Sequence, residues 1–431
     1  MCGIVGYIGN KPAVDILLDG LEQLEYRGYD SSGIAVKCPE EIKVYKAEGK
    51  LKNLREELAP HAYEISKSTL GIGHIRWATH GAPTVVNAHP HTCGCGKLVV
   101  VHNGIIENYK ELKAELEAKG CKFRSQTDTE TVAHLVALIY GEVKDLTKAV
   151  QMATKRLEGA YALCIMHNDE PNKLVATKRN APLVVGVGEN EYYVASDVPA
   201  IIKHTNKAIY IKDNQVVTLT PNSLKLEDEF GGEIIPKVEV LPWEPVALSK
   251  MGFKHFMLKE IHEQPDVIRN ILIGKLHTSD SPIVLDEVKL TKEHLRKLNR
   301  IQVIACGTSL HAAMVGKYII ESFCGIPVDV EASSEYIYRK TVTDEHTLVI
   351  GVSQSGETAD TLTAIKQAKS KGSHVLIITN RPDSTMAREA DSLIPVSAGI
   401  EVSVAATKSY IAQLTSFYLL ALYMAEIKES M

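Results

Sequence analysis

The chain has 431 residues, 45% hydrophobic and 23% charged, with a formal net charge of −5. This composition is typical of a soluble globular protein with two or three domains, and the acidic balance argues against a general nucleic-acid or membrane-surface binder. The apolar segment 417–425 is too short to span a membrane, and no basic region follows Met1 as in a secretory signal. Eight cysteines in so long a chain do not make a disulfide framework. We therefore expect a cytoplasmic protein.

Residues 1–240 alternate short strands with a few helices. The expected strands are 2–8, 34–36, 70–76, 98–101, 160–167, 173–176, 192–195, 208–211 and 215–219. The expected helices are 12–25, 107–119, 129–140 and 146–157, the first with Ile16, Leu17, Leu21 and Leu24 on one face. This order of elements indicates an α+β layered domain.

A change of composition follows, marked by Pro236, Pro242 and Pro245. We place a linker at 241–256, between domains at 1–240 and 257–431. After a helix at 256–273, strands are expected at 301–305, 328–331, 348–352, 375–379 and 393–396, and helices at 310–323, 334–339, 359–371 and 410–424. Strands separated by helices predict a parallel, doubly wound sheet.

The first residues carry a possible nucleophile. Once Met1 is removed, Cys2 holds both a thiol, with a pKa of roughly 8.5, and an α-amine, with a pKa of roughly 7.7–8.0. The amine is then a base within reach of the thiol, which is the arrangement that N-terminal nucleophiles use. The alternative for this short segment alone is a cysteine without a catalytic role.

Polar residues gather at three later positions of the first domain. Arg76 has the fork of donors that clamps a carboxylate, although a surface salt bridge is the alternative, and Trp77 is suited to covering a site or channel. The Asn103 amide beside the Gly104 N–H is suited to an oxyanion hole, or simply to a turn. Asp128 is suited to holding a substrate ammonium, to capping the following helix, or to both.

Four residues suggest a metal site. His89, His91, Cys93 and Cys95 alternate, so on a strand they would share a face as zinc ligands do. Structural zinc sites more often contain two cysteines separated by two residues, a spacing that this segment lacks. We therefore expect no metal here.

In the second domain, two turns rich in Ser and Thr follow predicted strands. One contains Thr308 and Ser309, and the other runs from Ser353 to Thr358. Hydroxyls and N–H groups at a helix start favour a phosphate dianion, and ligands bind at the carboxyl edge of a parallel sheet. The glycine motifs of nucleotide sites are absent, so a nucleotide is not expected. The alternative for each turn is ordinary helix capping.

Several of these segments resemble the glutaminase domain of the class II glutamine amidotransferases. They are MCGI (1–4), YRGYDS (26–31), RWATHG (76–81), NAHP (87–90), HNG (102–104) and TDTE (127–130). The resemblance implies an Ntn-hydrolase αββα sandwich. It implies these roles: Cys2 as nucleophile with its α-amine as base, Asn103 and Gly104 as oxyanion hole, Arg76 and Asp128 as holders of glutamine, Thr79 and His80 as pocket lining, Arg27 as support of the N-terminus, and Trp77 beside the ammonia path.

The segment SQSGET (353–358) resembles the signature of the SIS (sugar isomerase) domain, which implies an α/β doubly wound fold. The sugar phosphate would be held by Thr308, Ser309, Ser353, Gln354, Ser355 and Thr358. The segments 254–265 and 401–413 resemble the amidotransferases that convert fructose 6-phosphate and glutamine to glucosamine 6-phosphate and glutamate. That resemblance implies no cofactor and a homodimer as the assembly.

The sequence departs from this family in one large respect. Family members carry two SIS domains, whereas this chain reaches Met431 after one, and Ser403 and Ala406 differ from the usual Gly and Ser. We therefore expect these 431 residues to catalyse the glutaminase half alone. Two alternatives stay open. One is another class II amidotransferase, for instance one that uses phosphoribosyl pyrophosphate, whose acidic loop we do not find. The other is a sugar-phosphate sensor or scaffold.

Overall fold

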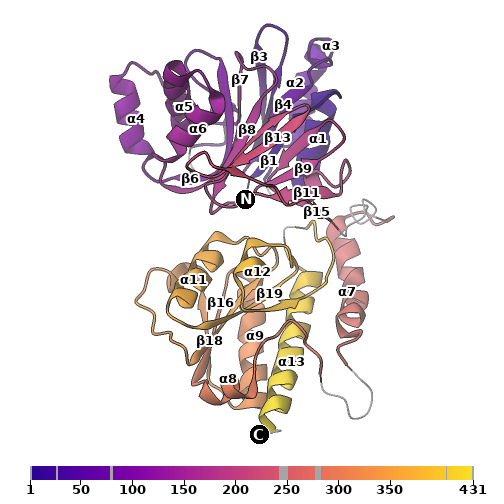
Figure 1. The fold of residues 1–431 in the computed structure, drawn as a ribbon. Helices are drawn as coiled ribbons and strands as arrows, with labels where there is room; N and C mark the ends of the chain where they lie inside the picture. Colours follow the sequence, from indigo (N-terminus) through magenta and orange to yellow (C-terminus); the bar gives the residue numbers. More distant parts are fainter. Residues whose placement is uncertain are drawn as a thin grey trace. The chain divides into compact units, whose positions relative to one another are not determined.

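The computed structural model describes residues 2–25, 28–77, 81–241, 251–276, 283–403 and 405–429. The chain divides into two compact units, Met1–Val246 and Ala247–Met431 (Figure 1). Most of the expected linker, residues 242–250, lies outside the described residues.

Two antiparallel sheets form the centre of the first unit. One has the order β15-β11-β9-β10-β1-β4-β2-β3 and the other β14-β13-β12-β8-β7-β6-β5. The first contains β1 (Gly3–Ile8), β2 (Ser31–Lys37), β3 (Ile42–Glu48), β4 (Leu70–Arg76), β9 (Val184–Val187), β10 (Tyr192–Ala195), β11 (Lys207–Tyr210) and β15 (Glu239–Val240). The second contains β5 (His91–Thr92), β6 (Leu98–Ile106), β7 (Gly159–His167), β8 (Leu174–Arg179), β12 (Val216–Thr220), β13 (Ser223–Glu227) and β14 (Glu233–Ile234).

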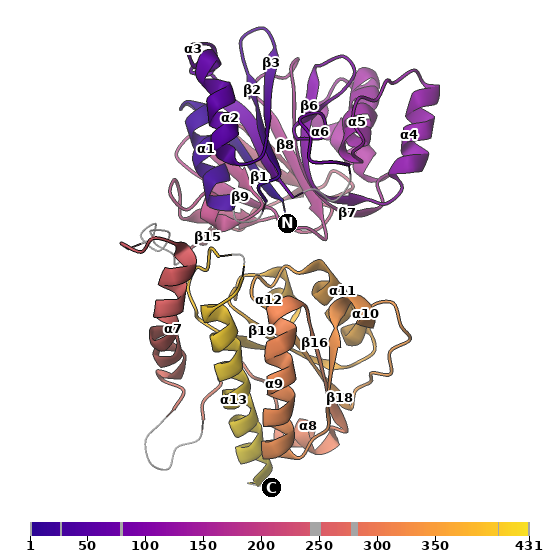
Figure 2. The same ribbon diagram turned by 180° about the vertical axis from the view of Figure 1, so that it is seen from behind.

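Helices cover the outer faces of this pair of sheets (Figures 1 and 2). The helices α1 (Ala13–Leu24), α2 (Leu51–Leu58) and α3 (Ala62–Ile65) lie on one side, and α4 (Tyr109–Ala118), α5 (Thr129–Val143) and α6 (Leu146–Thr154) on the other. Because side chains alternate along a strand, Val99 and Val101 of β6 pack between the sheets, while Leu98 and Val100 pack under the helices. The expected αββα sandwich is confirmed, with β3, β9 and β13 as strands that the sequence did not reveal.

The second unit contains a parallel sheet of order β17-β16-β18-β19-β20. Its strands are β16 (Arg300–Ala305), β17 (Val328–Ala332), β18 (Thr347–Ser353), β19 (His374–Thr379) and β20 (Ser392–Pro395). Its helices are α7 (Phe256–Leu272), α8 (Lys292–Lys297), α9 (Gly307–Cys324), α10 (Ser333–Tyr336), α11 (Ala359–Ser370), α12 (Thr385–Glu389) and α13 (Lys408–Glu429). The predicted α/β doubly wound fold is confirmed.

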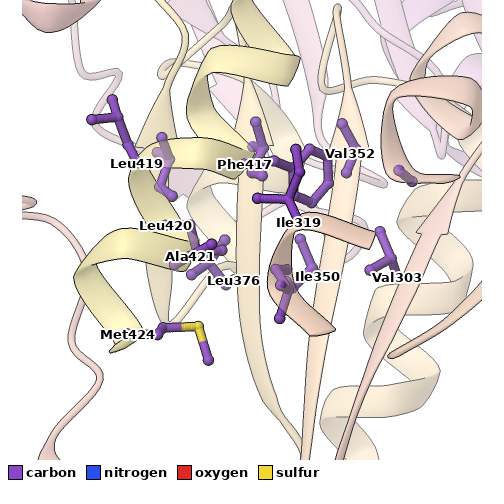
Figure 3. Packing of buried hydrophobic residues seen from close by; sticks show 14 of the residues in the cluster. Val303, Ile319, Ile350, Val352, Leu376, Phe417, Leu419, Leu420, Ala421 and Met424 are labelled. Carbon is purple, nitrogen blue, oxygen red and sulfur yellow. The ribbon is translucent and has the colours of Figure 1, made fainter. Parts of the chain in front are cut away.

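Strand alternation also organises this second core. Val303 and Ile350 belong to the cluster on the α9 and α13 side, whereas Val349 belongs to the cluster on the α11 side. Figure 3 shows Phe417 of α13 beside Ile319 of α9 above the sheet. A Cβ atom at Gly316 would lie 2.5 Å from the Phe417 ring, so the two helices approach this closely only because residue 316 is glycine.

One described helix, α13, is long and apolar enough over Lys408–Lys428 to cross a membrane. However, Phe417, Leu420 and Met424 of this helix are buried in the core cluster with the sheet. A core helix meets the same criteria of length and composition, so this feature is weak evidence for a membrane span.

Candidate active site

Cys2 lies at the end of two central strands of the first unit. It directly precedes β1, and Gly3 pairs with Ile75 of β4, so the thiol lies beside the residue that follows β4. The Trp77 backbone N–H donates to Cys2 Sγ at 3.3 Å, and the thiol lies 3.4 Å from the Trp77 carbonyl oxygen. An N–H donor of this kind favours the thiolate, which is the reactive form of cysteine.

Arg76 ends β4 and is almost fully buried, with 4% of its surface exposed. Its guanidinium donates to the carbonyl oxygens of Gly81 and Ala82, both at 3.3 Å. Burial lowers the pKa of Arg76, and the nearby Cys2 and Asp128 act in the opposite direction. The guanidinium therefore lies close enough to both groups for their negative charge to act on it.

Asn103 and Gly104 occupy β6 of the facing sheet, next to β7. Asn103 Nδ2 donates to the Cys2 carbonyl oxygen at 3.2 Å, so the amide N–H points toward the N-terminal residue. Gly104 has φ +126°, and a Cβ there would lie 2.0 Å from the Ala160 carbonyl oxygen. Glycine is therefore the residue that fits this position, directly after Asn103 in β6.

His74 fixes the orientation of that amide, a role that was not predicted from the sequence. Its Nε2 lies 3.0 Å from Asn103 Oδ1 and 3.0 Å from the His102 carbonyl oxygen. Both partners are acceptors, so Nε2 carries the proton. Burial lowers the pKa of His74 to about 3, which keeps the ring neutral. The sequence contained a signal for this role: His74 lies two residues before Arg76 on an otherwise apolar strand. Residues two apart on a strand share a face, so His74 faces the same side as Arg76.

Asp128 lies just before α5 but does not cap it through its side chain. Asp128 Oδ2 instead accepts the Ile106 N–H at 2.8 Å and lies 3.9 Å from His102 Nδ1. The carboxylate thus joins the end of β6 to the start of α5. The capping alternative is wrong for the side chain, and the carboxylate remains close enough to Arg76 to influence its pKa.

The histidines of the supposed zinc motif bond to protein groups instead. His89 stacks on His74 with ring centroids 4.1 Å apart, and His91 Nε2 lies 3.0 Å from Thr127 Oγ1. Burial lowers the pKa values of His89 and His91 well below 6.5. Within the described ranges, no group of three or more His, Cys, Asp or Glu side chains is arranged to hold a metal ion.

Three residues with expected roles, Arg27, Thr79 and His80, lie outside the described residues. Trp77, expected beside the ammonia path, is described and has 41% of its surface exposed. Its ring meets the edge of Tyr29 at a centroid distance of 5.7 Å. The indole is therefore held at the surface by one aromatic contact rather than in the core.

The second unit brings its two polar turns to one sheet edge, because β16 and β18 are parallel neighbours. Ser353 Oγ accepts the Gly356 N–H at 3.0 Å and lies 3.0 Å from Thr358 Oγ1. Ser355 Oγ accepts the Glu357 N–H at 3.2 Å, and the Gln354 carbonyl oxygen accepts the backbone N–H of the residue after β19. The conformation of this loop is thus held by hydrogen bonds from its own hydroxyl and backbone groups.

The other turn differs from the expectation. Helix α9 begins at Gly307 rather than at residue 310, so Thr308 and Ser309 lie in its first turn. Thr308 is exposed at the edge, whereas Ser309 is buried and its hydroxyl accepts from Gln413 Nε2 at 3.0 Å. Gly307 has φ +57°, which allows the helix to start directly after the strand.

Two family models match the chain. Residues 83–203 match the glutamine amidotransferase domain, and residues 294–423 match the SIS domain. The chain therefore contains a glutamine amidotransferase domain followed by a SIS domain.

Relatives narrow this class. The glutamine–fructose-6-phosphate aminotransferase (isomerizing) of Symbiobacterium thermophilum is 48% identical over 426 residues, which are 99% of this chain and 69% of that protein. The protein of the same name from Clostridium tetani is 47% identical over 428 residues, with the same coverage. The chain belongs to the glutamine–fructose-6-phosphate aminotransferase family. Among solved structures, the C-terminal domain of the Francisella tularensis glucosamine-fructose-6-phosphate aminotransferase is 41% identical, covers 42% of this chain and 51% of that one, and has a TM-score of 0.40.

Proposed function

We propose that this protein takes part in the conversion of glutamine and fructose 6-phosphate to glutamate and glucosamine 6-phosphate, and that residues 1–431 by themselves catalyse the glutaminase half. In this proposal residues 1–240 are the glutaminase domain, 241–256 the linker and 257–431 the SIS domain. Family membership supports the overall reaction. The observation that carries the glutaminase half is the position of Cys2, whose thiol and carbonyl contact Trp77 and Asn103 at the ends of facing sheets.

The glutaminase step is an acyl transfer. Cys2 Sγ attacks the side-chain amide carbon of glutamine, and the α-amine of Cys2 takes the thiol proton once Met1 has been removed. The Asn103 amide and the Gly104 N–H stabilise the oxyanion. As the tetrahedral intermediate collapses, the α-ammonium of Cys2 returns the proton to the leaving nitrogen, the C–N bond breaks, ammonia is released and a γ-glutamyl thioester remains. Water then attacks the thioester, and glutamate leaves.

The rest of the glutamine molecule needs a clamp beside Cys2. In this proposal Arg76 holds the α-carboxylate and Asp128 the ammonium, with Thr79 and His80 lining the pocket and Arg27 supporting the N-terminus. Arg76→Ala should then raise the glutamine KM about 10–100-fold, since a hydrogen bond to a charged group contributes about 1.5–3 kcal/mol. Arg76→Lys keeps the positive charge but loses the forked pair of guanidinium donors, so its KM should lie between those of the wild type and Arg76→Ala. If steady-state kinetics show that kcat falls by as large a factor as KM rises, the clamp role is contradicted.

Ammonia then reaches the sugar past Trp77. The sugar phosphate is held, in this proposal, by Thr308, Ser353, Gln354, Ser355 and Thr358. Ser309, whose buried hydroxyl accepts from Gln413, supports the first turn of α9 instead. The support is that the exposed start of α9 and the loop after β18 meet at one edge of a parallel sheet, where backbone N–H groups favour a phosphate. The reaction needs no cofactor in this account.

The deciding experiment measures both products separately. The chain is incubated with glutamine and fructose 6-phosphate, and glutamate and hexosamine phosphate are quantified. Equal amounts of both support the complete reaction for these residues. Glutamate alone supports the glutaminase half, and bound fructose 6-phosphate in the same sample favours the sensor alternative for the second unit. If neither glutamate nor hexosamine phosphate is formed, the proposal is overturned.

We also propose that the protein is a cytoplasmic homodimer that binds neither nucleic acid nor membranes. Several apolar side chains are exposed on the neighbouring helices α9 and α13: Met314, Tyr318, Phe323, Tyr418 and Leu422. Burial of such a surface against a second copy is favourable. Sedimentation equilibrium should give twice the chain mass, and a monomer at micromolar concentration would contradict the dimer.

A further inference from the structure

Two cysteines that have no part in the glutaminase site form a close pair. Cys93 and Cys95 lie in the tight turn between β5 and β6, with only Gly94 between them. The Cys93 backbone N–H donates to the Leu98 carbonyl oxygen at 3.1 Å, and the Leu98 N–H donates to Cys93 Sγ at 3.3 Å. The two sulfur atoms lie 2.9 Å apart. The hairpin therefore holds the two thiols in contact.

The two thiols differ in access. Cys93 has 4% of its surface exposed, whereas Cys95 is exposed to solvent. Burial, and then the hydrogen bond to Cys95, raises the pKa of Cys93. Cys95 is thus placed to react first with a molecule from solution, and Cys93 to react second with its neighbour. This division of roles is the one that thiol–disulfide exchange requires.

A pocket of about 440 Å³ adjoins the pair and has a marked charge. Besides Cys93 and Cys95, its walls include Lys119, Lys122 and Arg124. The other described residues that line it are Gly94, Gly120, Cys121, His134, Ala137 and Leu138, and none of these described lining residues carries a carboxylate. Lys119 is ion-paired with Glu115 at 2.8 Å, so Lys122 and Arg124 supply the positive charge beside the two thiols that favours a ligand carrying negative charge.

We propose that Cys93 and Cys95 are a thiol–disulfide exchange site for small anionic disulfides. The Cys95 thiolate attacks one sulfur of a disulfide RSSR, the S–S bond breaks, and RS⁻ leaves and takes a proton to become RSH. Cys93 then gives up its proton and attacks Cys95 Sγ in the mixed disulfide, which releases a second RSH. Two protein thiols are oxidised to one disulfide, and one RSSR is reduced to two RSH.

The test uses the full chain with Cys2→Ala, which removes the N-terminal thiol from the count. Glutathione disulfide serves as the anionic probe and cystamine as the cationic one, at equal concentrations and low ionic strength. After an acid quench, peptide mass spectrometry should show the 93–95 peptide lighter by two hydrogen atoms. Glutathione disulfide should react about tenfold faster than cystamine, and added salt should reduce the difference.

Variants separate the two steps. Cys95→Ser, at an exposed position, should abolish the reaction, whereas Cys93→Ser should stop it at a glutathione adduct on Cys95. Lys122→Glu, also exposed, should lower the preference for the anionic probe. Cys121→Ser is the matched control, because Cys121 lines the same pocket, and it should leave the rate unchanged.

Three results would overturn the proposal. One is an adduct on Cys121 with the 93–95 peptide still reduced. The second is an unchanged rate in Cys95→Ser. The third is that both probes react at equal rates and that Lys122→Glu has no effect. This result would refute the assignment of an anionic ligand.

Discussion

The two units place their polar groups in different ways. In the first unit the polar side chains are carried by strands of two facing sheets, where His74 of β4 orients Asn103 of β6 and the buried Arg76 is the last residue of β4. In the second unit they lie in the first turn of α9 and in the loop that begins at Ser353, the last residue of β18, whose hydroxyl accepts the Gly356 N–H. Side chains of a site on strands are positioned by the pairing of those strands and by contacts with side chains of other strands. We therefore expect single substitutions to cost more in the first unit than in the second.

The largest effect is expected for Cys2→Ala. Removing the nucleophile should lower glutaminase turnover by about 10⁴-fold or more, as for the nucleophiles of other acyl transferases. Fructose 6-phosphate binding should be unchanged, because the second unit has its own core. Glutamate release and calorimetric sugar-phosphate binding measure the two. Intact mass that shows Met1 retained on fully active wild-type protein would contradict the role of the α-amine.

Asn103→Ala should have the next largest effect. The loss of one oxyanion donor should lower kcat by about 10²–10³-fold and leave the glutamine KM nearly unchanged. Asn103→Asp is a useful companion, because it keeps the shape but replaces the donor by an acceptor and should be equally slow. Full kcat in either variant would show that the amide does not face the oxyanion.

The sequence predicted the candidate reactive residues of the first unit better than the contacts that position them. The strands beside Cys2 and Arg76 were predicted, because they are apolar and end in distinctive residues. The strand predicted at 98–101 was too short, because β6 continues through Asn103 to Ile106. The bond from His74 to Asn103 joins two sheets, and no local pattern encodes a contact between sheets. Strand β3 was missed because its lysines and glutamate mask the buried positions Ile42, Tyr45 and Ala47.

In the second unit the topology was predicted and the local geometry of the site was not. The alternation of strands and helices fixed the order of elements. The start of α9 was misplaced by three residues, since Gly307 followed by Thr and Ser is as typical of a turn as of a first helical turn. The consequence is chemical, because Ser309 faces Gln413 in the core rather than the sheet edge.

The buried histidines make the first unit sensitive to acid. Burial lowers the pKa of His74 to about 3 and those of His89 and His91 well below 6.5. Unfolded histidines bind protons near pH 6.5, so below that value the unfolded state holds more protons and the folded state loses stability as pH falls. The loss should be about 1.4 kcal/mol per pH unit for each histidine.

Hydrogen exchange, corrected for the intrinsic rate, measures this difference between the units. From pH 7 to pH 5, protection should fall more in β4 and β6 than in β16 and β18. His74→Gln keeps a donor toward Asn103 and removes one titrating group, so its acid loss should be smaller than that of the wild type. Equal loss of protection in both units would contradict the account.

The smallest effect is expected for Ser353→Ala in the second unit. The Ser353 hydroxyl accepts the Gly356 N–H and lies beside Thr358 Oγ1, so its removal leaves the loop N–H without this acceptor. A net cost of about 0.5–1.5 kcal/mol corresponds to about 2–10-fold weaker fructose 6-phosphate binding. Ser370→Ala, at the exposed far end of the following helix α11, is the matched control and should bind normally. Glutamate release without sugar phosphate should be unchanged in both variants. A hundredfold loss of binding in Ser353→Ala would show that this loop, like the strand-borne site, depends on single side chains, and the contrast between the units would not hold.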